Sequence, residues 1–377
     1  MQSNFKVMNT SKVFFTDFHT VPRMNIFKKL RQLIQHAGIQ QIDFNKKFVA
    51  IKIHFGEPGN MAYLRPNYAF QIVKEIKKMG GKPFLTDANT LYSGRRANAL
   101  DHLDAAYENG YSPFSAGCHI IIADGINGMD YREIEVNGDY CKTAKIGTAV
   151  ADADIIVSLN HFKGHEQTGF GGAIKNLGMG AASVMGKKEL HSTSIPIVEQ
   201  ENCTGCAVCV KSCRHEAITL NDERKAVINT SLCVGCGQCI AVCQFNAAQV
   251  DWDASPEELN CRIAEYTKAV LKDKQHFHIN FIMDVSPLCD CWGFNDVPVV
   301  PNIGIAASFD PVALDYACAD MVNKTPITEN CCLTNHDLLN HQDIFKAIHP
   351  HTDWKSCLIH AEKMGIGSTK YEVIVVE

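Results

Sequence analysis

Cys203-Thr-Gly-Cys206-Ala-Val-Cys209-Val-Lys-Ser-Cys213 is the stretch from which the organisation of this chain follows, and its pattern recurs in Cys233-Val-Gly-Cys236-Gly-Gln-Cys239-Ile-Ala-Val-Cys243. Deprotonated cysteine sulfur is a soft ligand that suits iron and zinc. At this spacing three neighbouring thiolates bind one [4Fe-4S] cluster, and the fourth crosses over to a second cluster. The pattern therefore predicts two clusters, one on Cys203, Cys206, Cys209 and Cys243, the other on Cys233, Cys236, Cys239 and Cys213.

The segment from Ile197 to Val250 resembles the two-cluster bacterial ferredoxins. Its halves repeat each other, since Glu216-Ala217-Ile218 follows the first run and Asn246-Ala247-Ala248 follows the second. A pseudo-twofold unit is therefore expected. A pair of zinc ribbons or a disulfide framework is the alternative for so many cysteines, and the double register of the two runs disfavours it.

The composition is that of a globular protein. The chain has 377 residues, of which 46% are hydrophobic and 20% charged, which suits two or three domains. A net charge of −5 without a basic stripe argues against a nucleic-acid partner. No apolar run reaches the length of a membrane span, about 18 residues, and Met1–Lys12 lacks the apolar segment of a signal peptide. With 17 cysteines, these features predict a cytoplasmic protein of an anaerobic or microaerobic cell.

Outside the cysteine runs, strand-like and helix-like hydrophobic patterns alternate. Short apolar runs predict the strands Lys12–Phe18, Phe48–Ile53, Pro83–Thr86, His119–Ala123, Ile155–Leu159, His276–Asp284, Val299–Ala306 and Tyr371–Val376. Helical spacing predicts the helices Met24–His36, Asn67–Met79, Arg96–Glu108, Ala144–Ala151, Pro256–Lys272, Pro311–Val322, Asp337–Ile348 and Trp354–Met364. Such repeated βα units predict an α/β fold, with a parallel or mixed sheet and helices on both faces.

The ferredoxin-like segment interrupts this α/β pattern. We therefore expect an α/β domain in two parts, residues 1–195 and 251–377, with an inserted α+β ferredoxin-like two-[4Fe-4S] domain at residues 196–250. An insert of this size is too small to build a large core, so binding of the clusters would stabilise its fold.

Polar side chains follow several predicted strands, at the edge where open α/β sheets bind ligands. They are His54 and Glu57, then Asp87 and Asn89, then Asp124, and finally His161, Lys163 and His165. We predict His54, His161 and His165 as proton-transfer residues of a catalytic site, with Asp87 orienting a partner. The alternative for each is a helix cap or a turn. A metal pair of His161 and His165 is a further alternative, which Gly164 between them disfavours.

A glycine-rich segment follows, Gly164-His-Glu-Gln-Thr-Gly169-Phe-Gly171-Gly172-Ala-Ile-Lys175-Asn176-Leu-Gly178-Met-Gly180. Glycines ahead of a helix bring backbone N–H groups to its N-terminus, where a phosphate or carboxylate can bind. We therefore predict that a small anionic ligand or cofactor binds at Lys163, Lys175, Asn176, Gly171 and Gly172. The spacing matches neither the phosphate loop nor the dinucleotide fingerprint. The alternative is a glycine-lined seam of close packing.

Two cysteine pairs lie outside the runs, Cys289-Asp-Cys291 and Cys331-Cys332. Paired thiols in a reduced cell can bind a metal or carry electrons. The alternative is that they are inert core residues. Of the two pairs, Cys289 and Cys291 are the stronger candidate for a functional role.

Several segments resemble the domain-of-unknown-function 362 family, many members of which carry a ferredoxin insert. These segments are Phe48-Val-Ala-Ile-Lys-Ile-His-Phe-Gly-Glu57, Asn160-His-Phe-Lys-Gly-His165, Gly171-Gly-Ala-Ile-Lys-Asn-Leu-Gly178 and Ser308-Phe-Asp-Pro-Val-Ala-Leu-Asp315. The resemblance covers nearly the whole chain and implies an iron–sulfur protein, but it implies no reaction. The layout of His161, His165 and Lys175 is also similar to that of nickel-pincer lactate racemases, although a likeness of fold does not assign chemistry.

Three functions fit these features. The leading one is a redox enzyme, or its electron-input subunit, whose clusters pass low-potential electrons to a ligand at the strand ends. It requires a redox partner protein. The second is an electron carrier or docking module with a closed cleft. The third is a maturation factor that handles a metal or cluster through Cys289 and Cys291.

The ferredoxin pattern has proline after the fourth cysteine of each run, where this chain has Arg214 and Gln244. Proline has no N–H, so these positions regain a donor that can hydrogen-bond a cluster sulfur and ease its reduction. We expect Arg214→Pro or Gln244→Pro to lower a cluster potential in voltammetry. Unchanged potentials in both variants would remove this role.

Overall fold

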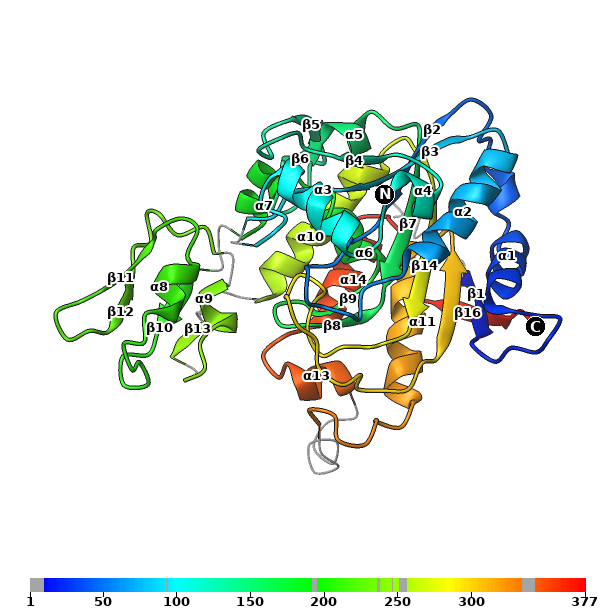
Figure 1. Cartoon of the computed structure of the whole chain (residues 1–377). Coiled ribbons are helices and arrows are strands. Elements are labelled where there is room, and N and C mark those ends of the chain that lie inside the picture. Colours follow the sequence, from blue (N-terminus) through cyan, green and yellow to red (C-terminus); the bar gives the residue numbers. More distant parts are fainter. Residues whose placement is uncertain are drawn as a thin grey trace, which may run out of the picture.

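Figure 1 shows the computed structural model of the chain, an α/β body with a smaller unit at one side. The structure describes residues 10–91, 94–191, 195–235, 238–245, 247–250, 256–333 and 343–377. Over those ranges, no helix is both long enough and apolar enough to cross a membrane.

A mixed sheet forms the centre of the body. Within the described residues it has eight strands, in the spatial order β16 (Tyr371–Val375), β1 (Ser11–Asp17), β15 (Gly304–Ser308), β14 (Gln275–Ile282), β7 (Ile155–His161), β2 (Phe48–Lys52), β3 (Lys82–Asp87) and β4 (Ile120–Ile122). The strands from β14 to β4 run parallel, whereas β15 runs antiparallel to both of its neighbours, β14 and β1. The predicted α/β class is confirmed, with a sheet of the mixed kind.

Helices cover both faces of this sheet, as predicted. Side chains of a strand point alternately to opposite faces, so Ala50 packs into one core while Val49 and Ile51 pack into the other. The first core lies under α6 (Ala173–Gly178), α10 (Pro256–Leu271), α11 (Pro311–Lys324) and α14 (Trp354–Lys363). The second lies under α1 (Ile26–His36), α2 (Pro66–Lys78) and α3 (Ala99–Glu108). Because both faces are covered, every residue of β7 is buried.

Shorter elements complete the body. They are η1 (Ile39–Gln41), α4 (Pro113–Ala116), the antiparallel pair β5 (Tyr131–Glu135) and β6 (Thr143–Gly147), α5 (Thr148–Ala151), the antiparallel pair β8 (Lys163–His165) and β9 (Gly169–Gly171), α7 (Val184–His191) and α13 (Ile344–Ile348). The β8–β9 hairpin directly follows β7, so the glycine-rich segment begins at the carboxyl end of a parallel strand.

The segment Ala144–Ala151, predicted as a helix, differs in the structure, where β6 is followed by the single turn of α5. Ala144 and Ile146 are buried, and Thr143 and Lys145 are partly exposed. An alternation of two belongs to a strand, and β6 pairs with β5. The helical prediction for residues 144–147 is therefore wrong.

Two other predicted elements have different limits. The strand predicted from Val299 begins at Gly304, because Pro301 has no N–H for a sheet hydrogen bond. Of the predicted helix Asp337–Ile348, residues 337–342 lie outside the described residues, and α13 covers the remainder from Ile344.

The described residues from 195 to 250 form the smaller unit in Figure 1, which we call the cysteine-rich unit. It contains the antiparallel pairs β10 (Pro196–Val198) with β13 (Ala248–Val250) and β11 (Ile218–Leu220) with β12 (Ala226–Ile228), and the helices α8 (Val208–Ser212) and α9 (Gln238–Ala241). It has a core of its own, in which Ile218, Ala226 and Ala247 pack with Cys203 and Cys239. In the chain it lies between α7 and α10.

Glu265 of α10 is a buried carboxylate that connects this helix to the loop at residues 139–141 and to α14. It accepts the backbone N–H groups of Asp139 (2.7 Å), Tyr140 (3.1 Å) and Cys141 (2.6 Å), and it lies 2.9 Å from Nε2 of His360 on α14. Its loss would leave several donors without their acceptor.

We expect Glu265→Ala to lower the free energy of unfolding by about 3 kcal/mol, because buried N–H groups without an acceptor are costly. The measurement is the midpoint of chemical denaturation under anaerobic conditions. Glu258→Ala is the control, because Glu258 lies on the same helix and pairs with Arg262 at i,i+4, a contact worth about 0.3 kcal/mol. Equal shifts in the two variants would contradict the role of Glu265.

Candidate functional site

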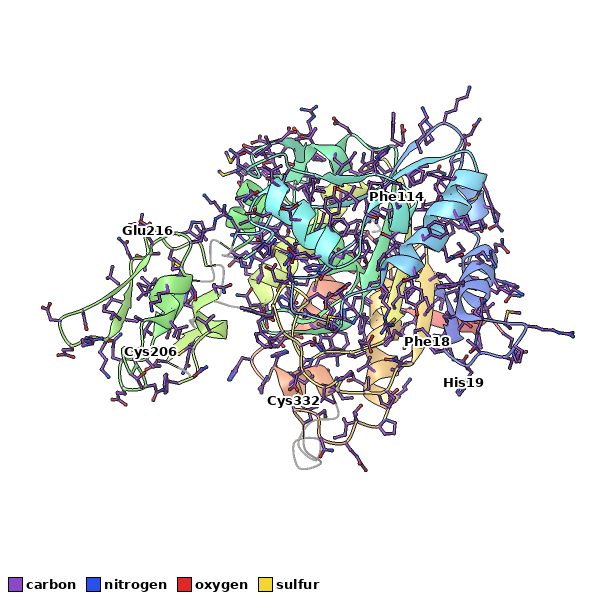
Figure 2. All side chains as sticks on the ribbon, in the orientation of Figure 1. Phe18, His19, Phe114, Cys206, Glu216 and Cys332 are labelled. Atoms are coloured by element: carbon purple, nitrogen blue, oxygen red, sulfur yellow. The ribbon has the colours of Figure 1, made fainter. Side chains whose placement is uncertain are left out.

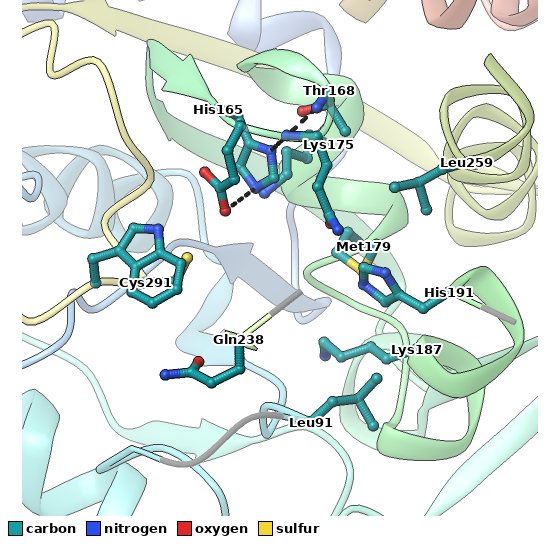
Figure 3. Close-up of a pocket in the computed structure, with 13 residues that line it drawn as sticks. Leu91, His165, Thr168, Lys175, Met179, Lys187, His191, Gln238, Leu259 and Cys291 are labelled. Carbon is teal, nitrogen blue, oxygen red and sulfur yellow. Dashed lines mark hydrogen bonds and ion pairs between the residues drawn. The ribbon is translucent and has the colours of Figure 1, made fainter. Parts of the chain in front are cut away.

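Two adjoining cavities lie at the carboxyl ends of the parallel strands. The sheet-side pocket, of about 60 Å³, has a lining that includes His54, Asp87, Arg96, Lys163, Lys175, Asn176, Lys187, Cys289 and Cys291. The unit-side pocket (Figure 3), also of about 60 Å³, has a lining that includes His165, Glu166, Thr168, Lys175, Lys187, His191, Gln238, Cys291 and Trp292. The two share Lys175, Met179, Lys187 and Cys291, so they are parts of one site. Each has room for a few waters or a small polar group.

Buried ion pairs form the base of the sheet-side pocket. Lys52 Nζ on β2 lies 2.8 Å from Oδ1 of Asp87 at the end of β3, and Arg96 Nε lies 2.8 Å from Oε2 of Glu57. Burial alone would raise the pKa of Asp87, but Lys52 and His102 hold it well below its usual range. Because a buried ion pair gains little stability, this group of charges indicates a functional site.

His54, a predicted proton-transfer residue, lies in the sheet-side pocket beside Arg96. Its Nε2 lies 3.0 Å from the Arg96 guanidinium, and its Nδ1 faces the N–H of Gly56 at 3.0 Å. Burial and the Arg96 charge lower the pKa of His54 to about 3. The ring is therefore neutral and weakly basic at neutral pH, which favours a role in positioning Arg96.

His161, at the end of β7, is buried beside the loop that carries Asp290. Its Nδ1 lies 2.9 Å from the Asp290 carboxylate, and its Nε2 lies 2.8 Å from the carbonyl oxygen of Met283. Lys163 Nζ also approaches Asp290, at 3.3 Å. Burial would raise the pKa of Asp290, but His161 and Lys163 lower it below its usual range. His161 thus contacts Asp290 through one ring nitrogen and Met283 through the other, and the ring positions this loop.

The same loop brings Cys289 and Cys291 to the site. Cys289 is buried, and Lys175 Nζ lies 3.8 Å from its sulfur. A hydrogen bond from the Cys291 thiol lowers the pKa of Cys289 well below its usual range; burial opposes this, and Lys175 and His165 add to it. The same interaction raises the pKa of Cys291 well above its usual range. Of the two thiols, Cys289 is therefore the more acidic and Cys291 the less acidic.

His165, at the end of β8, lines the unit-side pocket (Figure 3). Its Nδ1 accepts the N–H groups of Gln167 at 3.1 Å and Thr168 at 3.2 Å. Its hydrogen is therefore on Nε2, which lies 3.6 Å from Glu166. This N–H is the one available to the Cys289 thiolate.

The glycine-rich segment places Lys175 in both pockets. The first N–H groups of α6, those of Ala173 and Ile174, donate to the buried carboxylate of Asp315 at 2.7 and 2.9 Å. A Cβ on Gly172 would lie 2.3 Å from that carboxylate. Close packing therefore accounts for Gly172, and the protein's own carboxylate binds at the N-terminus of α6.

Gly171 separates the two lysines of this segment. A Cβ there would lie 3.4 Å from Cδ of Lys175 and 3.5 Å from Cε of Lys163. These are ordinary van der Waals distances, so Gly171 lies in contact with the stems of both lysines, whose like charges repel unless an anion lies between them.

Three predicted residues bond within the protein. Asn176 accepts a hydrogen bond from Lys52 Nζ at 2.7 Å and donates to Asn160 at 2.7 Å. Asn89 donates to Asp124 at 2.9 Å, and Asp124 also accepts the first N–H of α7. The turn-and-cap alternative therefore accounts for Asn89 and Asp124.

Polar atoms without a partner face the unit-side pocket. Among the described residues, His191 Nδ1, Trp292 Nε1 and Glu166 Oε2 are buried without a hydrogen-bond partner, and all three side chains line this pocket. Buried polar groups are nearly always hydrogen-bonded. The three atoms, two nitrogens and one carboxylate oxygen, therefore leave unused hydrogen-bonding capacity beside Lys175 and Lys187.

Sequence reasoning missed Lys187, His191, Trp292 and Arg96 as site residues. Tertiary packing brings them together from α7 and from two loops. Burial lowers the pKa of Lys187 to about 8, against the opposing charge of Asp124. One hint was available in the sequence: His191 lies at the end of α7, just ahead of the cysteine-rich unit.

Two side chains of the cysteine-rich unit contact the rim of the site. Arg214 donates to the carbonyl oxygens of Thr90 (3.0 Å) and Ala97 (3.2 Å), and Nε2 of His215 lies 3.1 Å from that of Leu91. The residue that replaces proline in the first run thus binds the α/β body.

The second predicted cysteine set lies closest to this rim. Arg214 follows Cys213 directly, and Gln238, which lines the unit-side pocket (Figure 3), precedes Cys239. Both cysteines belong to the set predicted to bind the second cluster. The pocket therefore begins one residue away from a predicted cluster ligand.

The cysteines of the first predicted set lie near one another. Burial raises the pKa of Cys209, and so do three nearby thiols, those of Cys206, Cys203 and Cys243. Backbone N–H groups approach these sulfurs, from Ala226 to Cys203 and from Ala247 to Cys243, both at 3.3 Å.

In the second set, burial and the nearby Cys213 thiol raise the pKa of Cys233. The N–H of Ala217 donates to Cys213 at 3.4 Å. Cys236 lies outside the described residues. Over the described part of the chain, no three His, Cys, Asp or Glu side chains are arranged to hold a metal ion. A [4Fe-4S] cube takes one thiolate at each of four corners, so its ligands stand further apart than those of a single ion.

Comparisons with known proteins give one family and distant relatives. The family model of a domain of unknown function, DUF362, matches residues 49–320. A thylakoid-associated protein of Synechocystis is 27% identical over 120 residues, which are 32% of this chain and 34% of that protein. The match thus spans about a third of that relative's length.

Two solved structures share part of the arrangement. A protein from Thermotoga maritima is 9% identical, with a TM-score of 0.36 over 68% of this chain and 50% of that chain. The lactate racemase apoprotein from Thermoanaerobacterium thermosaccharolyticum is 11% identical, with a TM-score of 0.32 over 72% of this chain and 51% of that chain. In each case the match spans about half of the other protein.

The burial of His191 predicts a pH dependence of stability. Burial, Lys175 and His165 lower its pKa from 6.5 to about 3. The unfolded chain therefore binds this proton first as the pH falls. Above pH 6.5 the neutral ring costs no stability. As the pH falls from 6.5 towards about 3, the unfolded chain binds a proton that the folded ring does not, and stability falls by about 5 kcal/mol in total.

We expect His191→Gln to weaken the acid-side fall in the denaturation midpoint between pH 6.5 and about 3. His19→Gln is the control, at the exposed position labelled in Figure 2. Parallel pH curves for His191→Gln and the wild type would contradict the buried, neutral state of this ring.

Proposed function

The chain belongs to the DUF362 family, whose shared domain is of unknown function, and we propose that it is an iron–sulfur electron-transfer protein acting on a small anionic ligand. In this proposal residues 196–250 are an inserted ferredoxin-like domain with two [4Fe-4S] clusters. The clusters supply one-electron transfer. The α/β body binds the ligand at its strand ends, so that the whole is a redox enzyme or its electron-input subunit.

The internal repeat supports the two clusters. The glycine in the first gap of each run has the same left-handed conformation, with φ of +69° at Gly205 and +67° at Gly235. The N–H groups of Ala217 and Ala247, which are equivalent in the repeat, donate to the last cysteine sulfur of their runs. Such N–H···S bonds are the contacts that tune cluster potentials.

One observation carries the proposal that electrons reach the ligand: a residue adjacent to a predicted cluster ligand lines the pocket. Gln238, next to Cys239, faces the same cavity as Lys175 and Cys291. The first cysteine set includes the exposed Cys206, labelled on the cysteine-rich unit in Figure 2. Electrons would therefore enter from a redox partner protein at the first cluster and leave from the second.

Charge supports an anionic ligand. Lys52, Arg96 and Lys163 each lie near a buried carboxylate. Among the described residues, Lys175 has no carboxylate within ion-pair distance, and its ammonium instead lies 3.8 Å from the Cys289 sulfur. Lys187 likewise has no carboxylate within ion-pair distance among the described residues and lines both pockets. In this proposal Lys187 supplies the positive charge that would bind and orient an anion.

The two alternative functions fit the site less well. An electron carrier that only docks a partner requires no pocket in the α/β body, and two polar pockets are present. A maturation factor would bind a metal cation at Cys289 and Cys291, but Lys163 and Lys175 lie beside these thiols and repel a cation. Metal content distinguishes the maturation factor from the proposed function, whereas a ligand bound in the pocket distinguishes the electron carrier from it.

We expect anaerobically purified protein to contain about eight iron and eight acid-labile sulfide per chain, with the visible spectrum of [4Fe-4S] clusters. Cys206→Ser should lower both to about four, because it removes one ligand of one cluster. Cys332→Ser, at an exposed cysteine outside the cysteine-rich unit, should leave them unchanged.

Zinc in place of iron would refute the cluster assignment. Additional nickel, zinc or iron beyond the clusters, lost on mutation of Cys289 or Cys291, would favour the maturation factor. If only the iron and sulfide of the clusters are found, the pocket holds no additional metal, and its expected ligand is an organic molecule.

A further inference from the structure

We propose that Cys289 and Cys291 form a redox-active dithiol, which takes up two electrons singly from the neighbouring cluster and passes them as a pair to a small anionic disulfide. The inference rests on the proposed function, because the clusters are its electron donors. It adds the protein groups that receive the electrons and the chemical class of the substrate.

The first step is the rigid placement of the two thiols. The residue between them, Asp290, is held by its carboxylate at His161 and by its carbonyl oxygen, which accepts the N–H of Glu57 at 2.9 Å. The loop is also held upstream, where Gly164 N–H donates to the carbonyl oxygen of Ser286 at 2.8 Å. The two cysteines are separated by this one fixed residue and both line the sheet-side pocket, so their sulfurs can approach each other to form a bond.

The second step is the charge of the reduced state. Reduction of a disulfide leaves a thiolate, which is costly to bury without a counter-ion. Lys175 Nζ lies 3.8 Å from the Cys289 sulfur and provides that counter-ion. The Nε2–H of His165 and the thiol of Cys291 add hydrogen bonds to the same sulfur. The site is thus built for one thiolate and one thiol, the reduced form of a dithiol couple.

The third step is the electron route. Cys291 lines both pockets, and Gln238, next to Cys239, also lines the unit-side pocket. The docking contacts of Arg214 hold this arrangement together. A cluster carries one electron, whereas reduction of a disulfide needs two, so a dithiol here would convert single electrons into pairs.

The chemistry balances as follows. Two reduced clusters each give one electron, the Sγ–Sγ bond of Cys289 and Cys291 breaks, and one proton goes to Cys291. A low-potential electron-carrier protein reduces the clusters again. The Cys289 thiolate then attacks one sulfur of the substrate disulfide and displaces a thiolate. Cys291 gives up its proton and attacks Cys289, which releases the second thiolate and restores the disulfide. With one proton from Cys291 and one from solvent, two thiols leave.

The first experiment measures the couple itself. The cluster-containing protein is equilibrated with dithiothreitol buffers of graded potential, quenched in acid and alkylated with N-ethylmaleimide. We expect the peptide with both cysteines to change from disulfide to doubly alkylated in a two-electron transition. A peptide that is doubly alkylated at every potential would overturn the inference.

The second experiment tests the route and the substrate class. Photoreduced clusters are mixed with 3,3′-dithiodipropionate, and their reoxidation is followed by absorbance. We expect Cys291→Ser to lose this reoxidation and Cys332→Ser to keep it.

Arg214→Ala should slow the reoxidation about tenfold, because two docking hydrogen bonds are lost, whereas Gln244→Ala, at the equivalent position of the other run, should not. Cystamine, a small cationic disulfide, should react more slowly than the dianion.

The outcomes separate this inference from the proposed function. Full iron and sulfide content with wild-type reoxidation in Cys291→Ser would refute the dithiol and leave the iron–sulfur function standing. Equal rates with the anionic and the cationic disulfide would refute the substrate class. Absence of clusters would refute both, because the dithiol would have no donor.

Discussion

The buried carboxylate of Asp290 is the constraint on which the site depends. A carboxylate without solvent contact must be neutralised and hydrogen-bonded, and here His161 from β7 and Lys163 from β8 do both. β7 is a strand of the central sheet, and β8 follows it directly in a separate two-stranded hairpin. Because Asp290 lies between Cys289 and Cys291, the same contacts fix both cysteines. The end of β7 and the hairpin thereby determine where the two sulfurs lie.

The internal repeat of the cysteine-rich unit is symmetric in its cysteines and asymmetric at the positions that follow them. Gly205 and Gly235, and likewise Ala217 and Ala247, have the same conformation or contact in both halves. After the fourth cysteine of each run the halves differ. Arg214 donates to two carbonyl groups of the α/β body, whereas its equivalent, Gln244, makes no such contact among the described residues. This difference in side chains lets the unit contact the body through one of the two equivalent positions and not through the other.

The sequence predicts most of the α/β body because its strands and helices carry clear periodicity, as in β7 and α11. It predicts β6 wrongly, since Ala144 and Ile146 alternate over too short a stretch to be distinguished from a helix. Asp87 and Lys163 could be predicted as pocket residues, because they follow predicted strands and the carboxyl ends of parallel strands meet at one edge of the sheet.

The remaining site residues depend on contacts that no local pattern records. His191 and Trp292 come from separate segments and meet only through packing. Local patterning also gives no sign that the N-terminus of α6 binds Asp315, a residue far along the chain. Conversely, the role of Arg214 follows from tertiary contact, although its departure from the ferredoxin pattern is visible in the sequence.

The segment Thr90–Ala97, of which residues 92–93 lie outside the described residues, joins the cysteine-rich unit to the pocket walls. Thr90 and Arg96 line the sheet-side pocket, and Leu91 lines the unit-side pocket. The backbone carbonyl groups of the same segment bind Arg214 and His215. Arg96 is in turn held by Glu57, the residue whose N–H donates to Asp290. The position of the cysteine-rich unit is thus linked to the thiol loop through a chain of direct contacts. A chain of packed and hydrogen-bonded groups is the physical means by which one site can bias another. Docking of the unit and the geometry of the thiols therefore belong to a single structural system.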